Sequence, residues 1–438
     1  MSIVSSNSSE GINSRLMLFD LPPTDTSITN VNYIEIRPTS QITPSNPIVY
    51  DLPASGVEYK ALNDATHAVK FRILKSDGTL PAEDAKVAPI NLTLQSLFKQ
   101  VDVYLDGKLI SSSDNNYHYG AYIETVLKYG SEAKASQLQS QLYYKDKGQM
   151  SSSDPSTGDN SGLYNRSKYT KGGTVCTLEG RIFSSLHNIK RLLLNGLRIT
   201  YRFYRNPDNL VLMSSEVGAS YKVEIIDHCI KIPYVSVSDA IILSHAEILK
   251  TQTAMYPMKK VEVKTFSVAS GVLNFNELVS QDLVPHCIIV GFVSSQAYNG
   301  DLKMNPYEFK PYSVNYLNLT LDGVSVGNSP LETKFSLAEI EYTEAYLALF
   351  KLASKFNKDS GNNVEFSDFQ NGYSLFAFEI NPLKSYNTEA LYPLKTGSLR
   401  LQCKFDTHLP EAINVITYSV FDSVIHIDQA RTVTVENS

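Results

Sequence analysis

The chain has 438 residues, of which 42% are hydrophobic and 19% are charged. A chain of this length has room for two or three domains, each with its own core. Its net charge of −6, from 39 bases and 45 acids, argues against a protein that condenses nucleic acid by itself, because that role needs clustered Lys and Arg. With 27 Tyr, 18 Phe and no Trp, the composition favours strands.

Residues 1–28 are polar at their start, and we expect them to form a flexible N-terminal arm. Met1–Gly11 is polar and lacks an apolar core, so we expect no signal peptide there, and no apolar run reaches the length of a membrane span. Four cysteines lie far apart without a Cys-x-x-Cys pair, which predicts buried, reduced thiols in a protein that folds in the cytoplasm or nucleus: Cys176, Cys229, Cys287 and Cys403.

Apolar and polar residues alternate in four clear stretches, which predicts strands with one buried face: Asn32–Arg37, Ala68–Leu74, Leu197–Tyr204 and Ser398–Asp406. Asp-Gly and Asn-Gly pairs, which reach the positive φ values of tight turns, follow or separate such stretches at Asp77, Asp106, Asn195, Asn299 and Asp322. Many strands with frequent turns indicate an all-β sandwich or jelly roll and not a parallel α/β sheet.

Three helices are expected among these strands. The first covers about Tyr117–Tyr129 and ends at Gly130, the second covers about Val237–Gln252, and the third covers about Leu337–Lys355. Capping-box patterns precede the last two, at Ser236–Asp239 and Ser336–Glu339. Their apolar side chains should share one face: Ile241, Ile242, Ile248 and Leu249 in the second helix, and Leu337, Ile340, Leu347 and Phe350 in the third.

Two polar stretches predict exposed loops. Gly148–Gly173, rich in Ser, Gly, Asp and Asn, is expected to be the least ordered part of the chain. A similar loop is expected at Asn357–Asn363. Since they occupy comparable places, the two loops could form one outward-facing surface.

One pattern occurs twice. An alternating strand runs through Leu105-Asp106-Gly107 into a helix with Ala121-Tyr122, and another runs through Leu321-Asp322-Gly323 into a helix with Ala345-Tyr346. A unit of about 200 residues is far longer than a solenoid repeat, so it indicates two domains of one fold. We expect a first domain at 29–235, a connecting helix and linker at 236–256, and a second domain at 257–438.

The residues do not indicate an enzyme, a cofactor or a metal site. His228-Cys229 and His286-Cys287 lie in strand-like runs, where neighbouring side chains point to opposite faces. We interpret Tyr144–Gly148 as a solvated turn. Four glutamates are predicted to form an acidic surface of the third helix: Glu332, Glu339, Glu341 and Glu344. Nucleotide-binding, nucleophile-elbow and zinc-protease motifs are absent.

Several blocks of the sequence, taken together, resemble one known family. They include AYIETVLKYGSEAKASQL at 121–138, RLLLNGLRITYRF at 191–203 and YPMKKVEVKTFSVASG at 256–271. The second half contributes residues 284–323, NGYSLFAFEINP at 371–382, GSLRLQCKF at 397–405 and NVITYSVFDSVIHID at 414–428. The blocks keep their order and cover nearly the whole chain beyond about residue 30, and they resemble the major capsid proteins of Polinton (Maverick) elements and adintoviruses.

The resemblance implies a double jelly roll, all-β, with two eight-stranded antiparallel sandwiches in tandem and a few short helices. It also implies a homotrimeric, pseudo-hexameric capsomer of an icosahedral capsid. Its partners would be other copies of the chain and a single jelly-roll penton protein. Sequence-specific nucleic-acid binding and a membrane span are not expected. The location would be the virion, after synthesis in the host cytoplasm.

Four residues are our candidates for packing at domain or subunit junctions: Tyr122, Glu124, Tyr346 and Phe350. An equally good interpretation is that the two tyrosines close their own sandwiches. Two other functions stay open. One is a secreted or surface carbohydrate-binding or adhesion module, for which a secretion signal is missing. The other is a cupin-type enzyme, which would need clustered His and Glu ligands.

Overall fold

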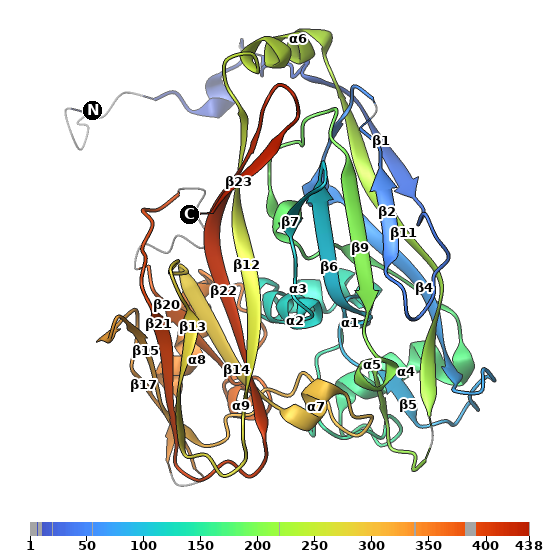
Figure 1. Cartoon of the computed structure of the whole chain (residues 1–438), viewed down its shortest axis with the longest axis vertical. Coiled ribbons are helices and arrows are strands. Elements are labelled where there is room, and N and C mark those ends of the chain that lie inside the picture. The colour runs from blue at the N-terminus through green and yellow to red at the C-terminus, as the bar shows by residue number, and fades with distance from the viewer. Residues whose placement is uncertain are drawn as a thin grey trace.

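A computed structural model describes residues 7, 11–19, 21–54, 56–218, 220–336, 339–381 and 391–437. In the first half, eight strands form two antiparallel sheets, in the orders β1-β11-β4-β8 and β2-β9-β6-β7 (Figure 1). Their bounds are β1 Ile28–Ile36, β2 Ile48–Leu52, β4 Thr66–Lys75, β6 Phe98–Leu105, β7 Lys108–Ser111, β8 Cys176–Arg181, β9 Ile199–Arg205 and β11 Tyr221–Val237.

The second half repeats this arrangement. Its sheets have the orders β12-β22-β14-β20 and β13-β21-β15-β16. The bounds are β12 Ala254–Val268, β13 Asn274–Ser280, β14 Cys287–Ser294, β15 Val314–Leu321, β16 Val324–Ser325, β20 Leu375–Glu379, β21 Leu399–Phe405 and β22 Ile413–Ile427. Counted along the chain, the eight strands of either half pair as 1-8-3-6 and 2-7-4-5. The predicted fold, two eight-stranded jelly rolls in tandem, is confirmed.

Shorter elements complete both jelly rolls. The short strands are β3 Tyr59–Lys60, β5 Val87–Pro89, β10 Leu212–Ser214, β17 Leu331–Glu332, β18 Lys334–Phe335, β19 Ile340–Glu341 and β23 Val433–Asn437. The helices are α1 Thr93–Ser96, α2 Tyr117–Lys128, α3 Ser131–Lys134, α4 Ser161–Thr170, α5 Asp208–Val211, α6 Asp239–Ile248, α7 Ser295–Asn299, α8 Thr343–Leu352 and α9 Phe366–Gln370. Helix α6 joins the last strand of the first jelly roll to the first strand of the second (Figure 1).

The alternating sequences lie where the sheets need them. In β21, Leu399, Leu401, Cys403 and Phe405 are buried, while Arg400 and Lys404 are exposed. Strand β22 differs, because nearly every residue along it is buried. One of its faces packs inside its own sandwich and the other faces the first jelly roll. Strand β1 is the opposite case, since all its residues except the last are exposed.

The two Leu-Asp-Gly turns are the same hairpin. Leu105 pairs with Lys108 across Asp106-Gly107, and Leu321 pairs with Val324 across Asp322-Gly323. The φ values are 47° and 80° in the first turn and 48° and 86° in the second. Positive φ at both central residues is the requirement of the type I′ turn. In each jelly roll, this hairpin joins the fourth strand to the fifth, and the repeated helix follows it.

The connecting helix is shorter than predicted. It begins at Asp239 and ends at Ile248, because Ser236 belongs to β11 and pairs with β1. Its N-cap, Ser238, makes no side-chain capping bond, so the predicted capping box is wrong. The expected buried face is also wrong for Ile248, which is 48% exposed, although Leu249 just beyond the helix is buried.

The third predicted helix begins later than expected. The Ser336 side chain does accept a hydrogen bond from the Glu339 backbone N–H, but this bond closes the β18–β19 hairpin. Helix α8 starts only at Thr343, so Ile340 lies in β19, where it is 52% exposed instead of facing inward. Leu337 lies outside the described residues. The predicted capping box at Ser336–Glu339 is therefore wrong, because the segment connects two strands and does not open a helix.

Two further segments differ from expectation because of contacts with residues far away in the sequence. Gly148–Gly173 contains helix α4, whose N-cap Asn160 accepts bonds from the N–H groups of Gly162 and Leu163. Gly130, expected in a left-handed C-cap, has φ −86° and caps α3 instead. A Cβ at Gly130 would lie 3.2 Å from the Gly361 carbonyl oxygen, so close approach of the second jelly roll explains this glycine.

Candidate functional site: the junction between the jelly rolls

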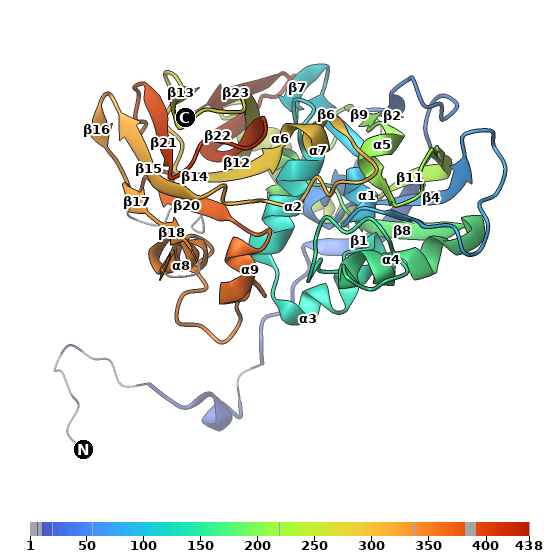
Figure 2. The same ribbon diagram turned by 90° about the horizontal axis from the view of Figure 1, so that it is seen from below.

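Helix α2 fills the space between the two jelly rolls (Figure 2). Ten of its twelve residues are buried, because it packs on β6 of its own jelly roll and on β12 of the other. At its start, the Asn116 side chain donates to the Val263 carbonyl at 3.2 Å and accepts from the Tyr298 hydroxyl at 3.1 Å. Gly120 lets the helix approach β12, since a Cβ there would lie 3.2 Å from Val263 Cγ2.

Aromatic rings form the apolar part of the junction. The rings of Tyr122 and Tyr307 stack with centroids 4.1 Å apart and planes 1° apart. Tyr119 stacks on Tyr298 in the same way, at 5.7 Å and 9°, and touches Phe309 edge-on. Stacked pairs of this kind stabilise by ~0.5–1.5 kcal/mol beyond the burial of their area. In each pair, one ring belongs to α2 and the other to the second jelly roll.

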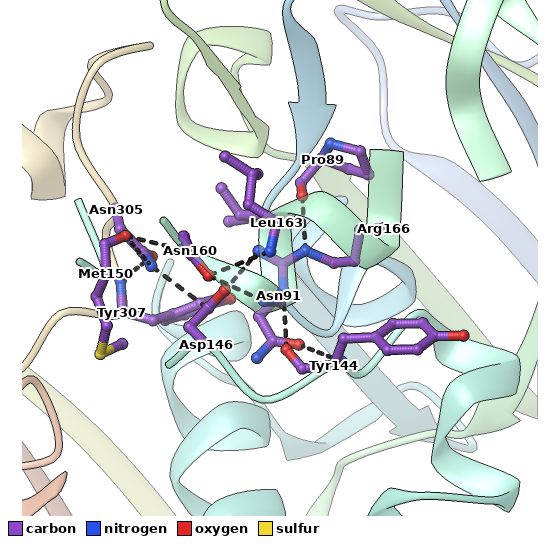
Figure 3. Close-up of polar contacts among 12 residues, drawn as sticks. Pro89, Asn91, Tyr144, Asp146, Met150, Asn160, Leu163, Arg166, Asn305 and Tyr307 are labelled. Carbon is purple, nitrogen blue, oxygen red and sulfur yellow. Dashed lines mark hydrogen bonds and ion pairs between the residues drawn. The ribbon is translucent and has the colours of Figure 1, made fainter. Parts of the chain in front are cut away.

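An ion pair lies at the polar centre of the junction (Figure 3). Arg166 of α4 and Asp146 are both fully buried, and Arg166 Nη2 lies 2.8 Å from Asp146 Oδ1. The other guanidinium nitrogens donate to the Pro89 and Tyr144 carbonyls, each at 2.9 Å. A buried pair is tolerated only when its remaining hydrogen-bonding groups are satisfied. This pair fulfils that condition and fixes the segment that was predicted to be a loose loop.

The same carboxylate reaches the second jelly roll. The Asn305 side-chain amide donates to Asp146 Oδ2 at 3.4 Å and to the Met150 carbonyl at 3.1 Å. From another strand connection, the Tyr373 hydroxyl donates to the Asp146 backbone carbonyl at 2.8 Å. The prediction of a solvated turn at Tyr144–Gly148 is therefore wrong. Asp146 is one of the links between the two sandwiches.

Lysines of the first jelly roll hold the polar loop of the second. Lys145 Nζ donates to Asp368 Oδ2 at 2.5 Å and to the Asn363 carbonyl at 2.6 Å. Lys134 Nζ donates to the Asn362 carbonyl at 2.6 Å, and burial holds the pKa of Lys134 well below its ordinary value. The predicted loop at 357–363 is present, but it lies at this junction and is bound by the first jelly roll.

The four candidate residues lie in two different surroundings. Tyr122 packs against the second jelly roll, and Glu124 lies 3.3 Å from Lys128 and 3.7 Å from Arg181 in its own jelly roll. Tyr346 donates to the Val364 carbonyl at 2.9 Å, and its ring packs edge-on against Phe350, with both inside the second jelly roll. The structure thus brings Tyr346 and Phe350 together and keeps them apart from Tyr122.

Beside α2, an open cavity of about 460 Å³ separates the two sandwiches. Its wall combines apolar and charged side chains, among them Leu127, Lys128, Arg191, Lys259 and Tyr418. Within the described part of the chain, no three His, Cys, Asp or Glu side chains gather as a metal site would require. No helix within these ranges is both long and apolar enough to cross a membrane.

No family model matches the chain. An uncharacterised protein of Caenorhabditis elegans is 26% identical over 425 residues, which cover 94% of this chain and 98% of that protein. A chain in the structure of the Sputnik virophage is similar with a TM-score of 0.66 and 14% identity, covering 100% of this chain and 94% of that one. The mavirus major capsid protein is similar with a TM-score of 0.52 and 12% identity, covering 99% and 97%. The fold that this chain shares with both viral chains is the double jelly roll.

Proposed function

We propose that the chain is the major capsid protein of an icosahedral double-stranded DNA virus or virus-like mobile element of the Polinton (Maverick) and adintovirus kind. The observation that carries the proposal is the full-length similarity to the Sputnik chain and to the mavirus major capsid protein, which covers both jelly rolls and the junction between them. In this proposal the chain is a structural protein and not an enzyme, and its location is the virion.

The junction between the jelly rolls supports a role of the chain as a rigid structural unit of a capsomer. A stack of buried tyrosines and a fully buried ion pair hold the two sandwiches in one orientation, so the pair behaves as a single block. Three such blocks around an axis present six similar domains, which gives a trimer a hexagonal outline. Permanent interfaces of this kind bury thousands of Å² of largely apolar surface.

We propose residues 29–235 and 257–438 as the bounds of the two jelly-roll domains, with a connecting helix and linker at 236–256. The partners are other copies of the chain and a single jelly-roll penton protein. For the arm before residue 29, the described part supports a role on assembly, because its apolar side chains are uncovered. Ile12, Leu16, Phe19 and Leu21 are 75%, 67%, 96% and 93% exposed.

The first experiment is the solution mass of the purified chain by light scattering after size exclusion. We expect about three times 48.7 kDa, stable on dilution. A clean monomer would contradict the capsomer and favour a carbohydrate-binding or adhesion module.

The role of the arm is tested separately. Deletion of residues 1–20 should leave the trimer mass unchanged and impair the formation of closed shells, as seen by electron microscopy. Shells of normal yield from the shortened chain would contradict an assembly role for the arm.

A further inference from the structure

The contact between the two jelly rolls of one chain shows how one jelly roll can bind another. The end of β7 and helix α2 cover the outer face of the sheet β12-β22-β14. Ser111, Gly120 and Glu124 lie on one side of this contact, and Val261 and Tyr418 lie on the other. The contact joins two unlike surfaces, a strand edge with its helix and the outer face of a sheet.

Because the two jelly rolls have one topology, each of these surfaces has a counterpart elsewhere in the chain. The counterpart of the edge is formed by β16, β17, the β18–β19 hairpin and α8, and we name it the β16–α8 edge. The counterpart of the covered face is the outer face of β1, β11, β4 and β8, and we name it the β1 face. In Figure 2, β16 and β17 lie on the left of the molecule, and β4 and β8 lie on the right.

Both counterparts are uncovered. Four of the ten residues of α8 are buried, compared with ten of twelve in α2. On the β16–α8 edge, Val324 is 69% and Ile340 is 52% exposed. On the β1 face, Tyr33 is 74% and Val31 is 44% exposed. Tyr33 faces outward because it lies two residues from Glu35, which is paired with Arg37 on the outer side of the sheet.

The β16–α8 edge has more carboxylates than ammonium groups, and the β1 face has a lysine that makes no ion pair with a described residue. The β16–α8 edge carries four carboxylates and two ammonium groups: Glu332, Glu339, Glu341, Glu344, Lys334 and Lys351. Lys334 is paired with Glu339 and Glu341, while Glu332 and Glu344 make no ion pair with any described residue. The β1 face carries a ladder of ion pairs, Arg37 with Asp227, Arg72 with Glu224 and Lys231 with Glu179. Lys70 in the middle of that face is exposed and makes no ion pair with a described residue.

We propose that the β16–α8 edge of one chain binds the β1 face of a second copy, in the way that β7 and α2 bind the β12-β22-β14 face within the chain. The contact buries Ile340 against Val31 and Tyr33. It also brings the unpaired glutamates of the edge to the unpaired Lys70 of the face. This inference rests on the proposed trimer and identifies the surfaces that close it. An interface between two unlike surfaces makes a ring when its rotation closes.

Two exposed positions test the surfaces without touching a core. Tyr33→Asp introduces a charge into the β1 face, and Ile340→Asp introduces one into the β16–α8 edge. Leu243→Asp on α6 is the matched control, since Leu243 is 70% exposed and belongs to neither surface. We expect the control to keep the wild-type mass, and we expect each of the other two variants to run as a monomer by light scattering, with association weakened at least tenfold.

Mixing the two monomeric variants gives the sharper result. The Tyr33→Asp chain still offers an intact edge and the Ile340→Asp chain an intact face, so an equal mixture should form a two-chain complex and stop there. Trimers of either single variant, or a mixture that stays monomeric or forms trimers, would overturn the assignment of surfaces. A monomeric wild-type chain would instead overturn the trimer itself, so the two failures are distinguishable.

Discussion

The connection between the fifth and sixth strands occupies residues 112–175 in the first jelly roll and 326–374 in the second. Both connections begin after the same Asp-Gly hairpin and both contain the repeated helix. In the first, the added helix α4 and the Arg166–Asp146 pair extend the connection and carry it to the neighbouring sandwich. In the second, α8 packs on β20 of its own sheet. One topology therefore supports two different roles for the same segment.

The interiors differ as well. In the first jelly roll, His228 Nε2 lies 3.2 Å from His67 Nδ1, and His67 Nε2–H donates to Gln95 Oε1, which also accepts from the Tyr117 hydroxyl. In the second, the corresponding space is filled by a cluster of phenylalanines: Phe292, Phe369, Phe376 and Phe405. The same strand order is thus compatible with an interior that contains a polar network and with one that is filled by apolar rings.

The largest expected difference between the two halves is their response to acid. Burial lowers the pKa of His67 to about 4 and of His118 and His187 to about 3, and it lowers the pKa of His228 as well. An unfolded histidine has a pKa of about 6.5. Below that pH the unfolded chain binds protons that the folded chain does not bind, and this lowers the free energy of unfolding. This stability is complete above pH 6.5 and is lost as the pH falls toward 4. At pH 5 the loss reaches ~2 kcal/mol for each of His67, His118 and His187.

All four of these histidines belong to the first jelly roll, so it should open first. In the second, burial acts to raise the pKa of Asp422, but its bonds to His286 and Lys259 leave that pKa below its ordinary value of 3.8. This contribution is kept until the pH falls below 3.8. Hydrogen exchange at pH 7.5 and pH 5 should show a loss of protection in β4 and β11 before β14 and β22. Equal losses in both halves would contradict the difference in their interiors.

The next effect comes from the buried ion pair. Asp146→Ala leaves the guanidinium of Arg166 charged and unpaired in a site with no solvent exposure, which should lower the free energy of unfolding by ~3–5 kcal/mol. Lys147→Ala is the control, since its pair with Glu365 is more than half exposed and should contribute at most ~1 kcal/mol. Urea unfolding measures both. Similar values for the two variants would mean that the pair does not hold the junction.

The repeated tyrosines give a direct comparison of the two helices. Tyr122 is fully buried between the jelly rolls, and Tyr122→Ala should cost ~3–5 kcal/mol. Tyr346 is only partly buried, so Tyr346→Ala should cost ~1–2 kcal/mol less. Thermal unfolding of the two variants checks the order. If Tyr346→Ala lowered the stability more, the junction between the jelly rolls would depend less on α2 than the burial of α2 indicates.

The smallest effect should be equal in both halves. Gly107 and Gly323 have φ values of 80° and 86°, and a Cβ at either position would meet nothing within 4 Å. Alanine there costs only the strain of a left-handed backbone, ~1–2 kcal/mol in each case. Chemical denaturation of Gly107→Ala and Gly323→Ala should give the same loss. Unequal losses would show that one of the hairpins is supported by contacts beyond its own turn.

The elements that sequence predicts well are those defined by residues close together in the chain. The alternation in Ser398–Asp406 and the two Leu-Asp-Gly turns need only their own neighbours, and the structure confirms them. The four predicted thiols are free, and three of them are buried. The repeat of turn and helix was enough to indicate two domains of one fold.

The parts that sequence missed depend on distant partners. Asp146 stands between two lysines and resembles any exposed turn, and its partners Arg166 and Asn305 are 20 and 159 positions away. Tyr307, which stacks on Tyr122, had no local signal at all. The Ser336–Glu339 pattern matched both a capping box and a hairpin turn, and only the pairing of β18 with β19 decides between them. The acidic surface was divided for the same reason, since Glu344 alone of the four glutamates belongs to α8.

Helix α6 also has a consequence for the order in which contacts form. Because the chain runs from β11 through α6 into β12, the two jelly rolls meet by closing a tether, at an effective concentration that no dilution can change. Half of the jelly-roll contacts in a ring of three chains would therefore exist before any two chains collide. Cutting the tether within α6 would turn each of those contacts into a second-order encounter, and assembly would then slow steeply as the protein is diluted.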